Sequence, residues 1–173
     1  MRKIILTYGL IAGVIVATLM MLSILFIKDH GVVGMVAGYL SMLIAFSFIY
    51  VGVKKYRDNE LGGVIKFGRA FLVGLCISLI GSLFYIVTWE VYMYFTNYTF
   101  MEEYAKSAIE GMRAKGAAAA EIAKYQSEMA TMTETYKNPI FRMLMTFTEI
   151  GPVGLLVSLI VAWVVRSPKG KGA

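Results

Sequence analysis

Three charged side chains stand inside long apolar stretches of the sequence: Glu90, Arg142 and Glu149. Where such stretches cross a membrane, an ionised group costs about 2.5–3.5 kcal/mol at the bilayer centre, so these residues usually face inward and find partners. At a rise of about 1.5 Å per residue, Glu90 and Arg142 come to similar depths on two different helices and can form an ion pair. Glu149 lies deeper, near the middle of a hydrocarbon core about 30 Å thick. We therefore predict an intramembrane polar network of these three residues.

The segment after Glu149 contains a predicted helix kink at Gly151 and Pro152. Proline removes one helix hydrogen bond and usually bends the helix in which it stands. An acid one turn from a kink near the membrane midplane occurs in proton and ion pathways. Two interpretations of Glu149 follow. It is either a group that handles protons or cations, or a protonated or paired structural acid that holds helices together.

A second group of residues that could bind a ligand is a dense basic patch. Its five cations stand within 16 residues and are Lys54, Lys55, Arg57, Lys66 and Arg69. Such a patch beside two helix ends suits anionic lipid headgroups. The plainer interpretation is the excess of Lys and Arg that cytoplasmic loops carry. The Gly62-Gly63 pair lacks the frame of a P-loop, so a nucleotide-phosphate site has little support.

The sequence lacks the residue sets on which most catalytic and metal sites depend. Its one cysteine, Cys76, and its one histidine, His30, exclude a disulfide and a Cys/His zinc site within a single chain. A nucleophilic Cys–His pair is disfavoured because Cys76 is predicted within the membrane and His30 in a loop. An acid–base pair of Glu90 and Glu149 would need close approach, but their depths differ by about 8 Å. We predict no catalytic residue, no cofactor and no metal.

Composition identifies the environment that must position these residues. The chain has 173 residues, of which 58% are hydrophobic and 16% charged, whereas soluble domains are about 45–50% apolar and about 25% charged. This excludes a disordered chain, a disulfide-rich secreted domain and an ordinary cytosolic enzyme. It predicts an integral membrane protein with a single membrane domain, residues 1–173. The net charge of +6 then acts as an orientation signal, and no nucleic-acid partner is expected.

Four apolar runs are long enough to cross a bilayer, which needs about 20 residues. They are residues 4–27, 32–53, 70–94 and 140–165, and they predict an all-α polytopic fold. The first run is too long for the apolar region of a signal peptide, so we interpret it as an uncleaved span. The bias of Lys and Arg places both termini and the loop at residues 54–69 in the cytoplasm. Residues 28–31 and the insertion at residues 96–139 then face outward.

The outer insertion is predicted to be a helical hairpin between spans 3 and 4. Apolar residues recur at three- and four-residue steps in two stretches, residues 100–115 and 118–136, which is the pattern of an antiparallel helix pair. Gly116 separates them, and Asn138-Pro139 ends the second. The hairpin either buries its apolar stripes on itself or offers them to another protein or to lipid headgroups.

Small residues at four-residue steps predict close helix packing. Gly9 and Gly13 form one such step, and Gly34 and Gly38 form another. Within a membrane this spacing lets helix backbones approach each other. Packing within one chain is the simpler interpretation, and a homodimer seam is the alternative.

Several motifs together resemble a known family. They are Tyr8-Gly9-Leu10-Ile11-Ala12-Gly13, Tyr56-Arg57-Asp58, Gly62-Gly63-Val64-Ile65-Lys66-Phe67-Gly68, Lys137-Asn138-Pro139, and Glu149 with Pro152-Val153-Gly154. The chain resembles a bacterial membrane family catalogued as domain of unknown function 4199. The resemblance implies a four-span helical protein of the inner membrane of a Gram-negative bacterium, and it implies no activity. Ala118 departs from the polar capping residue expected before the second hairpin helix.

Three classes of function remain open. The first is a non-enzymatic membrane protein that acts through lipid contacts or through a protein partner at the outer hairpin. The second is a small proton- or ion-coupled transporter, assembled as a homo-oligomer, that uses Glu149. The third, an intramembrane enzyme, is the least favoured because no catalytic set is visible.

Overall fold

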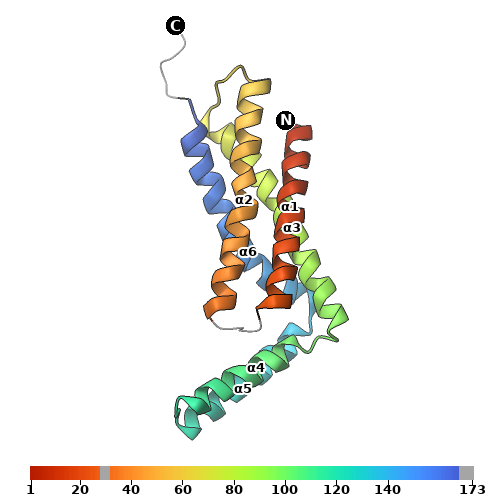
Figure 1. Cartoon of the computed structure of the whole chain (residues 1–173), viewed down its shortest axis with the longest axis vertical. Helices are drawn as coiled ribbons and strands as arrows, with labels where there is room; N and C mark the ends of the chain where they lie inside the picture. Colours follow the sequence, from red (N-terminus) through yellow and green to blue (C-terminus); the bar gives the residue numbers. More distant parts are fainter. Residues whose placement is uncertain (28–31, 168–173) are drawn as a thin grey trace. The chain divides into compact units, whose positions relative to one another are not determined.

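The computed structural model describes residues 1–27 and 32–167, and these form an all-helical fold. The loop that holds Lys28 and His30 and the tail that holds Lys169 and Lys171 lie outside the described residues. Six helices follow one another along the chain: α1 (Arg2–Phe26), α2 (Val32–Glu60), α3 (Phe67–Phe95), α4 (Phe100–Ala114), α5 (Ala119–Tyr136) and α6 (Pro139–Val165) (Figure 1).

Four of these helices, α1, α2, α3 and α6, are long and apolar enough to cross a membrane. The shortest has 25 residues, which is about 37 Å of helix and exceeds a core of about 30 Å. An α-helix suits this environment because it satisfies its backbone hydrogen bonds internally, where lipid offers none. The predicted all-α membrane fold is confirmed, and the chain is a multi-pass integral membrane protein.

The helices extend further than the apolar runs that predicted them. Helix α2 continues to Glu60, so Lys54, Lys55 and Arg57 lie on its last two turns and not in a loop. Helix α3 begins at Phe67 and includes Arg69. The predicted span ends at residue 53, where hydrophobicity is lost, and the helix continues beyond it because lysine and arginine remain good helix formers in water.

The chain divides into two compact units. The first, called here the bundle unit, comprises residues 1–88 and 147–173, and the second, the hairpin unit, comprises residues 89–146. Helices α3 and α6 contribute residues to both units.

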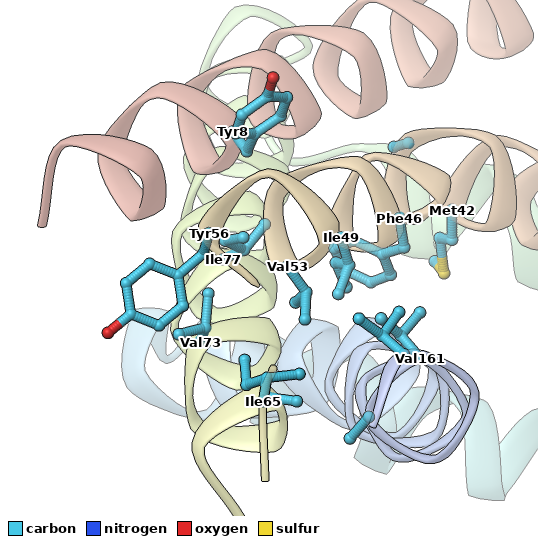
Figure 2. Close-up of a cluster of buried hydrophobic side chains, with 14 of the residues drawn as sticks. Tyr8, Met42, Phe46, Ile49, Val53, Tyr56, Ile65, Val73, Ile77 and Val161 are labelled. Atoms are coloured by element: carbon cyan, nitrogen blue, oxygen red, sulfur yellow. The ribbon is translucent and has the colours of Figure 1, made fainter. Parts of the chain in front are cut away.

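The core of the bundle unit is built from all four long helices. Figure 2 shows its buried side chains, among them Tyr8 of α1, Phe46 of α2, Ile77 of α3 and Val161 of α6. Ile65, which precedes α3, joins the same cluster and is 2% exposed. The buried hydroxyls of Ser41, Ser78 and Ser158 donate to carbonyls of their own helices, so they cost little in an apolar core.

Glycines allow the helices of the bundle unit to approach closely. A Cβ atom at Gly9 would lie 2.8 Å from Ile80, and one at Gly13 would lie 2.6 Å from the ring of Phe84. The first glycine step of the sequence is therefore used to pack α1 on α3 within one chain. Gly38 differs, because a Cβ atom there would meet nothing within 4 Å.

Candidate functional site

Arg142 forms the most fully bonded charged cluster of the hairpin unit. Its Nε and Nη2 atoms donate to the two carboxylate oxygens of Glu90 at 2.7 and 2.5 Å, and its Nη1 atom donates to the carbonyl of Tyr136 at 2.9 Å. The side chain of Arg142 is 2% exposed and that of Glu90 is 18% exposed. A planar guanidinium suits this two-pronged arrangement, which combines ion pairing with directed hydrogen bonds.

Aromatic rings surround the same arginine. The Cζ atom of Arg142 lies 4.9 Å from the ring centre of Tyr98 and 5.9 Å from that of Tyr136, within the range of cation–π attraction. The turn after α3 delivers Tyr98 to this position through two successive residues with positive φ, Asn97 at 52° and Tyr98 at 61°. Non-glycine residues adopt this backbone conformation infrequently.

Two further contacts fix the base of the hairpin. The indole Nε1 of Trp89 donates to the hydroxyl of Tyr136 at 2.7 Å, and the ring of Trp89 meets that of Phe100 edge-on at 4.8 Å. The Asn138 side-chain oxygen accepts from the backbone nitrogen of Ile140 at 2.9 Å, which caps α6 just before Pro139. The ends of α3, α5 and α6 are thereby joined, so the Arg142 cluster works as a structural clamp.

Glu149 belongs to the bundle unit and has a different environment. The hydroxyl of Tyr85 donates to its Oε2 atom at the long distance of 3.4 Å, and the Glu149 side chain is exposed on the bundle unit. The structure thus pairs Glu90 with Arg142 in the hairpin unit and places Tyr85 beside Glu149 in the bundle unit. The network of all three charged residues stays a prediction. Gly151 serves local packing, since a Cβ atom there would lie 2.9 Å from the ring of Phe147. Helix α6 runs on through Pro152.

Close approaches between helices show how far along the helix axes of the bundle unit Glu149 lies. Gly13 of α1 lies against Phe84 of α3, and Gly154 of α6 lies against Ser78 of α3. Because α6 runs opposite to α3, Glu149 comes near the level of residue 83 on α3 and residue 12 on α1. Residue 12 is about 14 Å of helix beyond Lys3, close to half of a core about 30 Å thick.

The basic patch lies at helix ends of the bundle unit. The Nζ atoms of Lys54 and Lys55 lie 5.9 Å from the ring centres of Tyr50 and Tyr8, respectively. Arg57 is used internally, because its Nε atom donates to Asp58 at 2.6 Å and its Nη1 atom to the carbonyl of Val165 at 3.3 Å.

Two other cations of the patch, Lys66 and Arg69, are exposed. The segment just before α3 is also tied to the end of α6, since the backbone nitrogen of Ser167 donates to the carbonyl of Ile65 at 3.0 Å. These exposed cations can attract anionic headgroups.

The hairpin unit also carries a groove between α4 and α5. The apolar stripes of these helices are only half-buried, and neither helix has a fully buried residue. Beside them lies an open groove of about 360 Å³, lined by Glu102, Ala105, Ile109, Gln126, Met129, Ala130, Thr133 and Glu134. Two helices alone cannot surround a side chain, so the stripes contact each other and still leave apolar surface open to binding.

The charged side chains near the groove are mostly exposed to solvent, and one of them, Glu134, forms an ion pair with Lys137. Lys137 donates to Glu134 at 2.6 Å, and this hydrogen bond raises the pKa of Lys137. Partial burial raises the pKa of Tyr125, with smaller contributions from Tyr104 and Glu128. The charged side chains that line the groove, Glu102 and Glu134, are both acidic.

A family model described as "Protein of unknown function (DUF4199)" matches residues 7–167. The chain belongs to this family. The match extends across both units, so the resemblance seen in the sequence motifs is confirmed. No curated protein and no solved structure matches the chain.

The sequence motifs of this DUF4199 protein did not reveal every partner in its polar clusters. Tyr98 and Tyr136 at Arg142, and Tyr85 at Glu149, were missed as partners. Their signal was available, since tyrosine at a membrane interface often supplies a hydroxyl or ring to a charged neighbour. Within residues 1–27 and 32–167, no group of three His, Cys, Asp or Glu side chains gathers where it could hold a metal ion.

Proposed function

We propose that this DUF4199 protein is a non-enzymatic protein of a bacterial inner membrane that binds another protein through the groove between α4 and α5. The observation that carries this proposal is the open groove of about 360 Å³ beside the apolar stripes of α4 and α5, which remain half-buried. Unburied apolar surface beside a concave site is typical of a protein-binding face.

The lining of the groove supports a particular kind of partner. Ala105, Ile109 and Met129 supply apolar surface, and Glu102 and Glu134 supply negative charge. Methionine adapts its shape to different apolar partners. We therefore expect a helical segment that has apolar residues on one face and a Lys or Arg beside them.

The clamp at Arg142 supports the same function in a different way. Arg142 holds Glu90 and the carbonyl of Tyr136 together, and Trp89 holds the hydroxyl of Tyr136. A hairpin that is fixed at its base loses less conformational entropy when it binds. The buried charges thus stabilise the binding face without taking part in chemistry.

Co-purification in mild detergent tests the proposed groove. Ala130 lines the groove, whereas Ala120 lies on the same helix, is exposed, and is not one of its lining residues. We expect a stoichiometric partner that Ala130→Trp displaces and Ala120→Trp retains. A partner retained by both variants, or no partner with the wild type, contradicts the proposal.

The proposed orientation places both termini and the basic patch in the cytoplasm and the hairpin outside. Ala118, just before α5, is exposed and offers a labelling site. With Cys76→Ala as background, a cysteine introduced by Ala118→Cys should react with an impermeant thiol reagent in intact cells. Labelling only after lysis contradicts this topology.

A second candidate function is proton- or ion-coupled transport through Glu149. The observation that favours it is the position of Glu149 near half the height of the bundle unit, with the hydroxyl of Tyr85 beside it. Transport predicts proton flux in proteoliposomes that Glu149→Gln abolishes. Equal flux in both proteins, or none in either, removes this candidate.

A further inference from the structure

The exposed face of α6 in the bundle unit carries a regular stripe that passes through Glu149. At alternating steps of three and four residues the stripe consists of Glu149, Pro152, Leu156, Leu159 and Trp163, and each of them is exposed. Leu156 is 58% exposed and Trp163 is 63% exposed. This spacing is that of the positions along which two helices pack in a coiled coil. Four members of the stripe suit lipid, and Glu149 does not.

We propose that this stripe binds the same stripe of a second copy of the chain, so that the two Glu149 carboxyl groups meet. Two copies with the same orientation in a membrane are related by a two-fold axis along the membrane normal, which brings each residue opposite its own equivalent at equal height. A carboxyl group can donate as well as accept when it holds its proton. Two Glu149 side chains therefore form a hydrogen bond that needs only one proton between them.

The chemistry of Glu149 favours a second copy over other occupants. Its hydrogen bond from Tyr85 is long, at 3.4 Å, and lipid tails offer no polar partner. A helix of another protein that carried a cation would also satisfy the acid, but Glu149 would be left facing lipid whenever that protein was absent. A second copy supplies the matching group whenever the chain itself is made. A single polar residue at such an interface also specifies the register of the helices and the number of helices that associate.

Helix packing inside the bundle unit leaves this stripe available. The close approaches at Gly9, Gly13 and Gly154 are occupied by α3 side chains of the same chain. Gly38 on α2 is also open, because an added Cβ atom there would meet nothing within 4 Å. Gly38 therefore marks the competing seam that an experiment must distinguish from the α6 stripe.

Disulfide cross-linking in membranes tests the proposed pairing directly. With Cys76→Ala as background, Leu156→Cys lies on the stripe. Gly38→Cys lies on the competing seam, and Val14→Cys is an exposed control near mid-height on α1, where Val14 is 55% exposed. We expect a cross-linked dimer from Leu156→Cys and little from the other two. Equal cross-linking at Val14, or cross-linking confined to Gly38, overturns the proposal.

Variants at Glu149 test the role of the acid. In liposomes, Glu149→Leu should raise the dissociation constant of the dimer about 3- to 20-fold, the range expected for one hydrogen bond between membrane helices. Glu149→Gln retains a donor and an acceptor, so its dimer should persist. An unchanged dissociation constant for Glu149→Leu, a monomeric wild type, or another protein bound at the stripe in place of the second copy contradicts the proposal. The Leu156→Cys experiment keeps Glu149 intact, so it decides the matter even where Glu149→Leu folds poorly.

Discussion

The two acids that lie on α3 and α6, Glu90 and Glu149, share a residue type and have opposite environments. Glu90 accepts two short hydrogen bonds from Arg142 within the hairpin unit. Glu149 accepts one long hydrogen bond from Tyr85 and remains exposed on the bundle unit. The difference teaches that a charged residue in an apolar stretch can have either of two structural roles. A carboxylate that accepts two short hydrogen bonds from a buried arginine stabilises the fold, whereas an exposed carboxylate with one long hydrogen bond remains available for a contact outside the chain.

The largest expected effect is the loss of the arginine. Arg142→Met leaves the Glu90 carboxylate without its main partner, and breaking a buried pair in this way typically costs about 3–5 kcal/mol. Unfolding in mixed micelles, followed by circular dichroism, should show a loss of this size. Stability equal to that of the wild type would show that the cluster is not a clamp.

Removal of both charges should cost less than removal of one. The double variant Glu90→Met, Arg142→Met replaces the ion pair by apolar side chains of similar size and leaves no uncompensated charge, so it should recover much of the stability lost by Arg142→Met alone. The same unfolding experiment measures this coupling. Strict additivity of the two single variants would show that Glu90 and Arg142 do not act as a pair.

A smaller loss is expected at the tyrosine beside the clamp. Tyr136→Phe removes the acceptor for the indole nitrogen of Trp89 but retains the ring near Arg142 and the backbone carbonyl. The expected cost is about 1–3 kcal/mol, since it leaves a partly buried donor without its partner. Trp89→Phe should give a similar loss, and the double variant should cost little more than either alone.

The smallest expected effect is at Glu149. Because this side chain is exposed on the bundle unit, Glu149→Leu should change the free energy of unfolding of the monomer by no more than about 0.5 kcal/mol. Measurement at high dilution in detergent separates this from any effect on self-association. A loss as large as that of Arg142→Met would mean that Glu149 is a structural acid like Glu90.

Hydrophobic runs and periodicity in the sequence predicted much of the fold. Four long apolar runs specify the membrane helices, and the three- and four-residue steps at Tyr104, Met112, Ile122 and Met129 specify the hairpin helices. Asn138-Pro139 predicted the start of α6, because asparagine caps a helix and proline is tolerated in its first turn whatever the rest of the fold. The apolar run did not specify where α2 ends, since hydropathy locates the membrane span and does not locate the last helical hydrogen bond.

The candidate sites were less predictable than the fold. The similar depths of Glu90 and Arg142 followed from helix rise alone. The position of Tyr98 over Arg142 depends on the positive φ angles of Asn97 and Tyr98 after α3. The types of these two residues do not predict that conformation. Whether Glu149 points into the bundle unit or away from it depends on the rotation of α6, and periodicity cannot reveal that rotation when apolar residues occupy every face of a helix.

Chemical labelling of the two acids tests their difference most directly. A lipid-soluble carbodiimide reacts with carboxyl groups that it can reach from the bilayer, and peptide mass spectrometry locates the adducts. At a protein-to-lipid ratio low enough to keep the chain monomeric, we predict modification of Glu149 and protection of Glu90 by Arg142. Modification of Glu90 with protection of Glu149, or equal modification of both, would contradict the assignment of one acid to the fold and the other to an outside contact.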